Sequence, residues 1–294
     1  MKNLIAILLF VFLAQPSKVD SARLLDDDRT LASDSFEGRE AATPGGRKAQ
    51  EYIISRFREI HLTTMGSTGD SFRRPFTLPG GREGVNLAGY LTGSKSPERY
   101  LVVTAHFDHL GIKNGKIYHG ADDNASGVAG LLASASYFAT HQPEHSILFV
   151  AFDAEESGLL GSKAFFVDPP VKPEAMVVDV NLDMISRNRK GEIFASGLHQ
   201  NPSLRPIVQA AQARGDLKLR LGHDVPGTGP EDWTNQSDHY NFYLAKVPFI
   251  YLGVEDHEDY HKPTDTFEKI DKDFFIAAAN LTVDLVAAFD KQLN

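Results

Sequence analysis

The sequence predicts a single α/β domain built on a mixed, mostly parallel β-sheet that is sandwiched by α-helices. Two observations support this fold class. Short apolar runs rich in Val, Ile, Leu and Phe alternate with segments of helical periodicity, a pattern typical of strands covered on both faces. The chain has 294 residues, 42% of them hydrophobic and 23% charged, which suits one globular domain with a sizeable core. No internal repeat or long linker divides it.

The pattern of apolar residues sets the expected order of elements. Strands are expected at 85–91, 100–105, 146–152, 176–182 and 247–252. Helices are expected at 45–61, 126–140, 158–167, 202–214 and 271–293. The stretch 222–237 carries Pro226, Gly227, Gly229 and Pro230 and is expected to be an irregular loop at the rim of a site.

The first 22 residues are expected to be a secretory leader, which leaves 23–294 as the mature domain. Lys2 supplies a positive start, residues 4–14 are apolar, and residues 19–22 offer small side chains for cleavage. A retained membrane anchor is the alternative, but the apolar run is short for a bilayer span. We therefore expect a periplasmic or secreted protein without stable membrane association. The absence of cysteine excludes disulfides and a lipid-modified cysteine.

The charge balance limits the classes of partner. The formal net charge is −9, whereas a general nucleic-acid binder needs an excess of Lys and Arg to neutralise phosphates. We therefore expect no nucleic-acid partner. Part of the negative charge can belong to carboxylates that hold metal ions.

Metal-seeking side chains follow the expected strands, and in an open α/β sheet ligands bind beyond the carboxyl ends of strands. His106 and Asp108 lie two residues apart on an extended segment, so their side chains leave the same face. A metal-binding histidine usually donates its second ring N–H to a carboxylate, a role that Asp108 could fill. Alone, this pair would more often be a surface hydrogen bond.

The acidic segments allow two interpretations each. Asp122 lies in the turn before the helix expected at 126, where it could bridge two cations or simply cap the helix. Glu155 and Glu156 are adjacent, so one carboxylate could hold metal while the other faces a substrate water. A bare Glu-Glu pair would more often be a solvated loop.

Two further candidates complete the set. Asp183 ends an apolar strand, where a charge is costly unless it is paired or coordinated. His261 follows the strand 247–252 across an acidic loop. Each also has an ordinary explanation, Asp183 as a turn cap and His261 as a loop histidine.

Electrostatics favours metal ions if these groups converge. Carboxylates about 4 Å apart repel by roughly 4 kcal/mol per pair at an effective dielectric constant near 20, so several would protonate without cations. Two divalent ions would balance three ligating carboxylates and a hydroxide. Imidazoles beside carboxylates favour zinc over magnesium or calcium.

A competing motif occurs near the carboxyl end of the chain. Residues 257–261 read His-Glu-x-x-His, the signature of single-zinc metalloproteases, which requires both histidines on one helix face. The stretch is acidic, follows Gly253, and is closed by Pro263, so it is a poor helix. The single-zinc interpretation is therefore the weaker one.

Read together, the segments resemble the co-catalytic di-zinc aminopeptidases of the secreted bacterial leucyl aminopeptidase type. The wider family includes glutamate carboxypeptidase and glutaminyl cyclase. The resemblance runs from about residue 31 to residue 270. Its specific parts are His-Phe-Asp-His-Leu-Gly at 106–111, Gly-Ala-Asp-Asp-Asn-Ala-Ser-Gly at 120–127, Ala-Glu-Glu-Ser-Gly-Leu-Leu-Gly-Ser at 154–162, Ser-Asp-His at 237–239 and Tyr-His-Lys-Pro-Thr-Asp-Thr at 260–266.

The resemblance implies a zinc exopeptidase fold over 23–294 and two zinc ions per chain. It assigns one ion to His106, Asp122 and Asp183, and the other to Asp122, Glu156 and His261. Glu155 would be the general base and Asp108 the partner of His106. The peptide bond between Asp122 and Asp123 would be cis. The implied activity is removal of N-terminal residues from peptides that have a free amino end.

Two other functions remain open on the same fold. One is cyclisation of N-terminal glutamine with a single zinc, which the complete second set of ligands disfavours. The other is non-catalytic peptide binding, which predicts lost ligands where none is lost. Trp233, Tyr240 and Tyr243 could line an apolar specificity pocket or pack in the core. Side-chain specificity and oligomeric state do not follow from the sequence.

Overall fold

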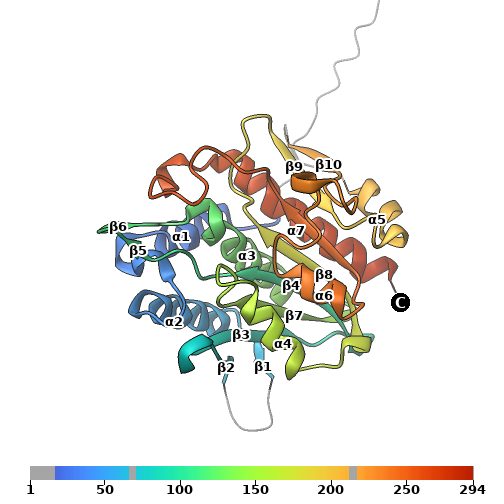
Figure 1. The fold of residues 1–294 in the computed structure, drawn as a ribbon. Coiled ribbons are helices and arrows are strands. Elements are labelled where there is room, and N and C mark those ends of the chain that lie inside the picture. Colours follow the sequence, from blue (N-terminus) through green and yellow to red (C-terminus); the bar gives the residue numbers. More distant parts are fainter. Residues whose placement is uncertain (1–16, 66–70, 212–216, 294) are drawn as a thin grey trace, which may run out of the picture.

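A computed structural model describes residues 17–65, 71–211 and 217–293. One nine-stranded sheet forms the middle layer, and helices cover both of its faces (Figure 1). The predicted fold class, a mixed and mostly parallel sheet sandwiched by helices, is confirmed.

Four adjacent parallel strands make the centre of the sheet. In spatial order they are β7 (His145–Phe152), β4 (Ser96–His106), β8 (Met176–Asp183) and β11 (Phe249–Gly253). Every residue of β7 and β8 is buried, as expected for strands with helices on both faces. Because the four strands are parallel, their carboxyl ends meet at one edge of the sheet.

The margins of the sheet are largely antiparallel. On one side β3 (Glu83–Leu91) runs antiparallel to β7 and also pairs with two short strands, β1 (Thr63–Thr64) and β2 (Arg73–Thr77). On the other side β9 (Glu192–Ser196) runs antiparallel to β11, and β10 (Lys218–Leu221) pairs parallel to β9. A separate hairpin joins β5 (Ile112–Lys113) to β6 (Lys116–Ile117).

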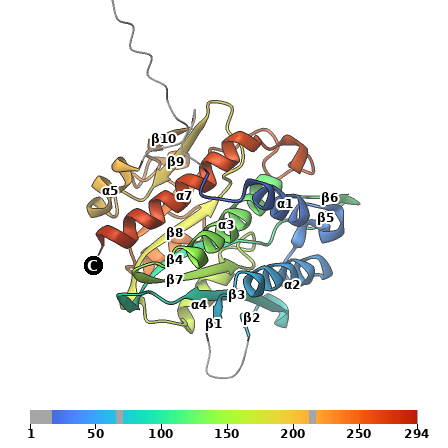
Figure 2. The same cartoon turned by 180° about the vertical axis from the view of Figure 1, so that it is seen from behind.

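The helices divide between the two faces (Figure 2). One face is covered by α1 (Ser21–Leu31), α2 (Pro44–Glu59), α3 (Gly127–Thr140) and α7 (Lys272–Gln292), with α5 (Arg205–Ala210) packed beside α7. The other face is covered by α4 (Leu160–Val167) and α6 (His239–Leu244). Among the described residues, no helix combines the length and the apolar character that crossing a membrane requires.

The expected strands and most expected helices are present within a few residues of their predicted bounds. The helix expected at 202–214 is shorter, since α5 ends at Ala210 and residues 212–214 lie outside the described residues. The helix α1, the short helix α6 and the marginal strands β9 and β10 were not predicted.

The predicted leader boundary at residue 22 falls inside the folded domain. Val19 is buried in the main core, and the Asp20 carboxylate caps α1 by accepting the Arg23 backbone N–H at 3.1 Å. The Lys18 backbone N–H donates to Asn280 Oδ1 on α7 at 2.7 Å. Residues 17–22 therefore contact the domain, and residues 1–16 of the expected leader lie outside the described residues, so the leader and its boundary stay predictions.

Candidate metal centre

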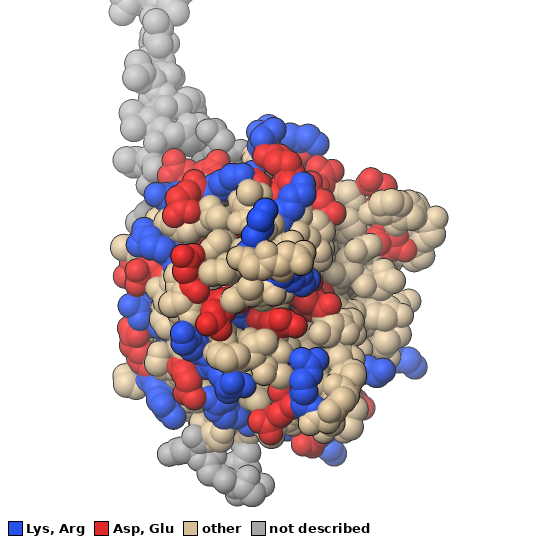
Figure 3. Space-filling model, turned by 60° about the vertical axis from the view of Figure 1, so that its left-hand side comes forward, with Lys and Arg blue, Asp and Glu red and all other residues tan. Residues whose placement is uncertain are grey.

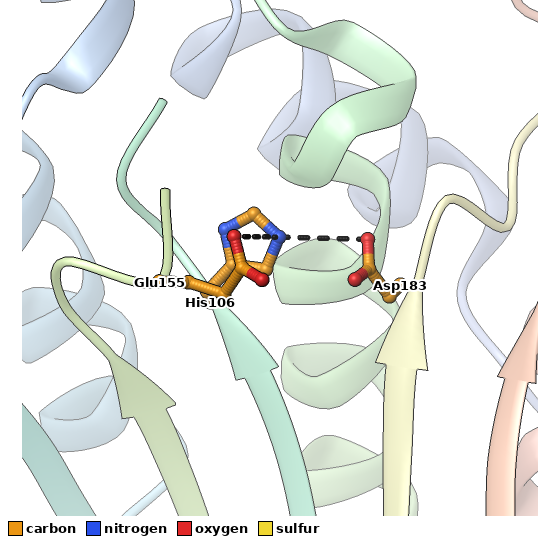
Figure 4. A group of neighbouring side chains, drawn as sticks. All are labelled: His106, Glu155 and Asp183. Atoms are coloured by element: carbon orange, nitrogen blue, oxygen red, sulfur yellow. Dashed lines mark ion pairs between the residues drawn. The ribbon is translucent and has the colours of Figure 1, made fainter. Parts of the chain in front are cut away.

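Side chains from four chain segments meet at the carboxyl edge of the central strands. His106 ends β4 and Asp183 ends β8, while Glu155 follows β7. Figure 4 shows these three side chains directed toward one another from separate strands. His261 reaches the same edge from the loop beyond β11.

One group of ligand atoms surrounds the His106 ring. Its Nε2 lies 3.4 Å from Asp183 Oδ1 and 3.8 Å from Glu155 Oε2. His106 is 1% exposed and Asp183 is 7% exposed, so the group is shielded from water. Buried ionisable groups in such contact need a counter-charge or a shared proton.

A second group lies beside the first and includes Glu156 and His261. The His261 Nε2 atom is 3.1 Å from Glu156 Oε2 and also 3.1 Å from Asp123 Oδ2. The other oxygen of Asp123 is 3.5 Å from His106 Nε2. The Asp123 carboxylate therefore stands between the two groups, with one oxygen toward each.

The structure places Asp123, and not the predicted Asp122, in this shared position. Asp122 Oδ1 accepts hydrogen bonds from the backbone N–H and the hydroxyl of Ser186, both at 2.7 Å. Its Oδ2 lies 3.0 Å from His257 Nε2. Asp122 is thus committed to interactions within the fold, and the geometry favours Asp123 over the predicted Asp122 as the carboxylate shared by the two groups.

The turn that carries Asp123 is held by side chains on both sides. The Asp265 carboxylate accepts the backbone N–H groups of Asp122 and Asp123 at 3.1 Å. The Asn124 side chain donates to the Leu182 carbonyl and accepts the Met184 backbone N–H, which fixes the turn to the end of β8. The resemblance had implied a cis peptide bond between Asp122 and Asp123. The cis peptide bond of this turn instead joins Asp123 to Asn124.

Asp108 positions the two glutamates more directly than it positions His106. Its carboxylate accepts the backbone N–H of Glu155 at 3.0 Å and that of Glu156 at 3.3 Å. His106 Nδ1 is 3.1 Å from the Asp108 backbone carbonyl, while the Asp108 carboxylate is 3.6 Å away. The predicted contact between Asp108 and His106 is present, and the shorter of the two distances is to the backbone carbonyl of Asp108, not to its carboxylate.

A buried arginine ties the ligand-bearing segments to the amino-terminal part of the domain. Arg39 is fully buried and donates to the carbonyls of Phe107, His119 and Gly120, as well as to that of Leu31. Phe107 follows one ligand residue and Gly120 precedes the Asp123 turn. The single guanidinium therefore fixes the spacing between these two segments.

The pKa values reflect the crowding of charge. Burial raises the pKa of Glu155 well above its usual value, and the Asp183 and Asp238 carboxylates raise it further. Burial would lower the pKa of His106, yet the Glu155 and Asp183 carboxylates raise it well above its usual value. Burial likewise opposes ionisation of Glu156, but hydrogen bonds from His109 and His261 hold its pKa well below the usual range.

The stretch 257–261 does not form the single-zinc helix site. Residues 258–261 form a turn, and His261 has a left-handed backbone with φ of 53°. His257 contacts Asp122, whereas His261 faces Asp123 and Glu156. The two histidines therefore contact different carboxylates and do not form one site.

The donor set fits zinc ions. His106 Nε2 lies within 3.5 Å of an oxygen of Asp123 and of Asp183. His261 Nε2 lies 3.1 Å from an oxygen of Asp123 and of Glu156. Imidazole nitrogens mixed with carboxylate oxygens suit zinc better than magnesium or calcium. The raised pKa values of Glu155 and Asp123 show how strongly the carboxylates here need a positive partner.

A family comparison agrees with this geometry. The model of peptidase family M28 matches residues 86–286, which contain all the side chains of the two groups. The chain belongs to peptidase family M28.

Curated relatives of this M28 chain include zinc enzymes. A probable zinc metalloprotease of Pyrenophora tritici-repentis is 30% identical over 251 residues, covering 72% of this chain and 57% of the relative. The aminopeptidase YwaD of Bacillus subtilis is 30% identical over 213 residues, covering 67% of this chain and 43% of the relative. The chain thus spans about half the length of these curated relatives.

Solved structures share the fold of the M28 chain. The zinc aminopeptidase BSAP of Bacillus subtilis has a TM-score of 0.71 at 17% identity, with 92% of this chain and 95% of that chain covered. The glutaminyl cyclase of Bacteroides thetaiotaomicron has a TM-score of 0.73 at 19% identity, with coverage of 92% and 98%. At these identities the likeness establishes the fold.

A cavity opens above the two groups in the M28 chain. His106, Asp123, Glu155, Asp183 and His261 contribute to its lining, and its other lining residues are Met184, Trp233, Gln236, Tyr251, Val254, Asp256 and Tyr260. Trp233 therefore lines the cavity, as one of the two interpretations of this residue allowed. Tyr240 and Tyr243 are not among the lining residues, and their rings stack on each other on α6.

Sequence reasoning gave no role to two residues of the site. Asp123 is the second of two adjacent acids, and the pair alone does not show which one faces the other ligand residues. His109 belongs to the quoted segment 106–111 but received no role. Its imidazole three residues after His106 was the available signal, and the structure places it against Glu156.

Replacing Asp123 with Asn tests the corrected assignment. We expect D123N to lose affinity for zinc by more than the roughly 10–100-fold that loss of an outer-shell partner costs. The matched variant D122N should keep its zinc and lose about 1–3 kcal/mol of stability, because its hydrogen bonds with Ser186 and His257 weaken. Metal analysis and thermal unfolding of both variants supply the measurement. Loss of zinc in D122N, with zinc retained in D123N, would restore Asp122 as the bridging ligand.

Proposed function

We propose that the protein is a zinc-dependent aminopeptidase that uses two zinc ions per chain. His106, Asp123 and Asp183 would hold one ion, and Asp123, Glu156 and His261 the other. The observation that carries the proposal is the Asp123 carboxylate, which has one oxygen 3.5 Å from His106 Nε2 and the other 3.1 Å from His261 Nε2. A carboxylate with one oxygen toward each of two ligand groups is the arrangement that a two-metal hydrolase requires.

Glu155 has the position and the proton affinity of a general base. Zinc held at this site would supply a Lewis acid and a water with a pKa lowered toward about 7. Glu155 lines the same cavity, and its backbone is fixed by the hydrogen bond to Asp108. Its raised pKa favours acceptance of a proton from the attacking water and later delivery of that proton to the departing amine.

The charge of the cavity favours the amino end of a peptide over the carboxyl end. Its lining contains Asp123, Glu155, Asp183 and Asp256, and the lining residues that the structure describes include no Lys or Arg. A free α-ammonium group would be attracted to these carboxylates, whereas a terminal carboxylate would lack a cationic partner. Trp233, Tyr251 and Met184 supply apolar surface for the first side chain of the peptide.

The charges on one face of the protein are mixed, which agrees better with a peptide substrate than with a nucleic-acid partner. On the face shown in Figure 3, Lys and Arg side chains stand among Asp and Glu instead of forming a continuous basic stripe. Such mixing gives little attraction to a phosphate backbone or to an anionic lipid surface.

A panel of fluorogenic aminoacyl and peptide substrates tests the activity. We expect hydrolysis of substrates with a free N-terminus, no hydrolysis when that amine is acetylated, loss of activity with chelator and recovery on zinc addition. Cleavage of blocked substrates from the carboxyl end would contradict amino-terminal trimming. Release of pyroglutamate from Gln-initiated peptides, without hydrolysis of Leu-initiated ones, would indicate a cyclase. Absence of both bound zinc and turnover would indicate a binding protein.

The variant E155Q separates chemistry from metal binding. Its turnover should fall by about 10²–10⁴-fold, the usual contribution of a general base, while its zinc content stays unchanged. In E156Q, by contrast, zinc content itself should fall, because Glu156 lies among the ligands. The exposed Glu174 provides a matched control, E174Q, with wild-type turnover and metal content. Wild-type turnover in E155Q would remove the general-base role from Glu155.

We also propose export of the protein, with the leader cleaved before Ser17 and not near residue 22. Cleavage at 22 would remove the Asp20 cap, worth about 1 kcal/mol, and the buried Val19 side chain, worth about 1.5–3 kcal/mol. Intact mass and N-terminal sequencing of protein recovered outside the cytoplasm measure the cleavage point. We expect a first residue at or before Ser17, and a first residue after Asp20 would contradict this boundary.

A further inference from the structure

His109 is a buried histidine at the metal centre that the proposed mechanism does not use. It lies three residues after His106, and its side chain is fully buried. Its Nδ1 atom is 2.7 Å from Glu156 Oε1 and 3.7 Å from Asp123 Oδ2. His109 could therefore be a fourth ligand of the second zinc ion or a hydrogen-bond partner of Glu156.

Distances between donor atoms separate these two roles. Two ligand atoms that each lie about 2.0 Å from one tetrahedral zinc are about 3.3 Å apart. The His261 Nε2 atom meets this spacing, at 3.1 Å from both Glu156 Oε2 and Asp123 Oδ2. So does His106 Nε2, at 3.4 Å from Asp183 Oδ1 and 3.5 Å from Asp123 Oδ1.

The contact between His109 and Glu156 does not fit ligands of one ion. At 2.7 Å it has the length of a charge-assisted hydrogen bond between a ring N–H and a carboxylate. The two oxygens of Glu156 are thereby divided between two histidines, Oε1 facing His109 and Oε2 facing His261. Only Oε2 is left for a metal ion beside His261.

The surroundings of His109 hold its ring in this orientation. A Cβ atom at Gly120 would lie 2.6 Å from ring atoms Cγ and Cδ2, so the backbone packs closely against the ring. His109 Nε2 is buried and has no hydrogen-bond partner among the described residues. The tautomer that carries its proton on Nδ1 leaves an acceptor unpaired at Nε2 and satisfies the carboxylate of Glu156.

We propose that His109 is a positioning residue of the second zinc site, donating from Nδ1 to Glu156 Oε1 so that Oε2 faces the ion. The inference rests on the proposed two-zinc function. Among the described residues, no printed hydrogen bond or ion pair joins His109 to His106 or Asp183, so its effect should be confined to the ion held by Asp123, Glu156 and His261.

Two variants of similar shape test this role. Asn keeps an N–H donor near the position of Nδ1, whereas Leu has nearly the same shape without a donor. In H109L, affinity at one zinc site, the one with Glu156 and His261, should fall about 10–100-fold while affinity at the other is unchanged, as expected for loss of an outer-shell partner. H109N should stay within a few-fold of wild type. The exposed His141 provides the control H141L, with both affinities unchanged.

Zinc affinities come from competition with a chromophoric chelator, and X-ray absorption of the zinc-loaded protein counts imidazoles per ion. We expect one imidazole at each ion in wild type and in H109N. An additional imidazole in wild type that disappears in both variants would make His109 a ligand and overturn the proposal. Wild-type affinity in H109L would also overturn it, leaving the two-zinc proposal intact. A wild-type chain that binds only one ion would overturn both.

Discussion

The structure of the metal centre depends on one shared carboxylate. Asp123 has one oxygen toward His106 and the other toward His261, so each ligand group is complete only with the same side chain. This requirement explains the density of bonds on its turn, where Asp265 holds the backbone from one side and Asn124 from the other. A small rotation of the turn would separate the two ligand groups. The buried hydrogen bonds of Asp265 and Asn124 oppose such a rotation.

The sheet supplies the remaining precision. Parallel strands β4 and β8 deliver His106 and Asp183 at adjacent carboxyl ends, and β7 leads directly into the glutamate pair. Asp108 then couples the end of β4 to that pair, since it accepts both glutamate N–H groups. Rigid strands and short loops thus bury several acids close together. Burial raises the pKa of Glu155 and of Asp123, and neighbouring carboxylates raise both further. The same crowding that is costly without cations makes a strong site for them.

Mostly apolar runs made the central strands predictable, because few other structures bury every residue of a segment such as β8. The choice between Asp122 and Asp123 was not predictable from local pattern, since it depends on contacts with Ser186 and Asp265 far along the chain. Helix α1 was missed because its buried face includes Asp27, whose charge is compensated by Arg56 at 2.9 Å. Tertiary pairing here overrides the expectation that acids lie outside.

The central claim is that two metal ions share Asp123, and diffraction from zinc-loaded crystals at the zinc absorption edge tests it most directly. The account predicts two anomalous peaks about 3.5–4 Å apart, one on each side of the Asp123 carboxylate. One peak should contact His106 and Asp183, and the other Glu156 and His261. A single peak, or a pair of peaks bridged by Asp122, would contradict the account.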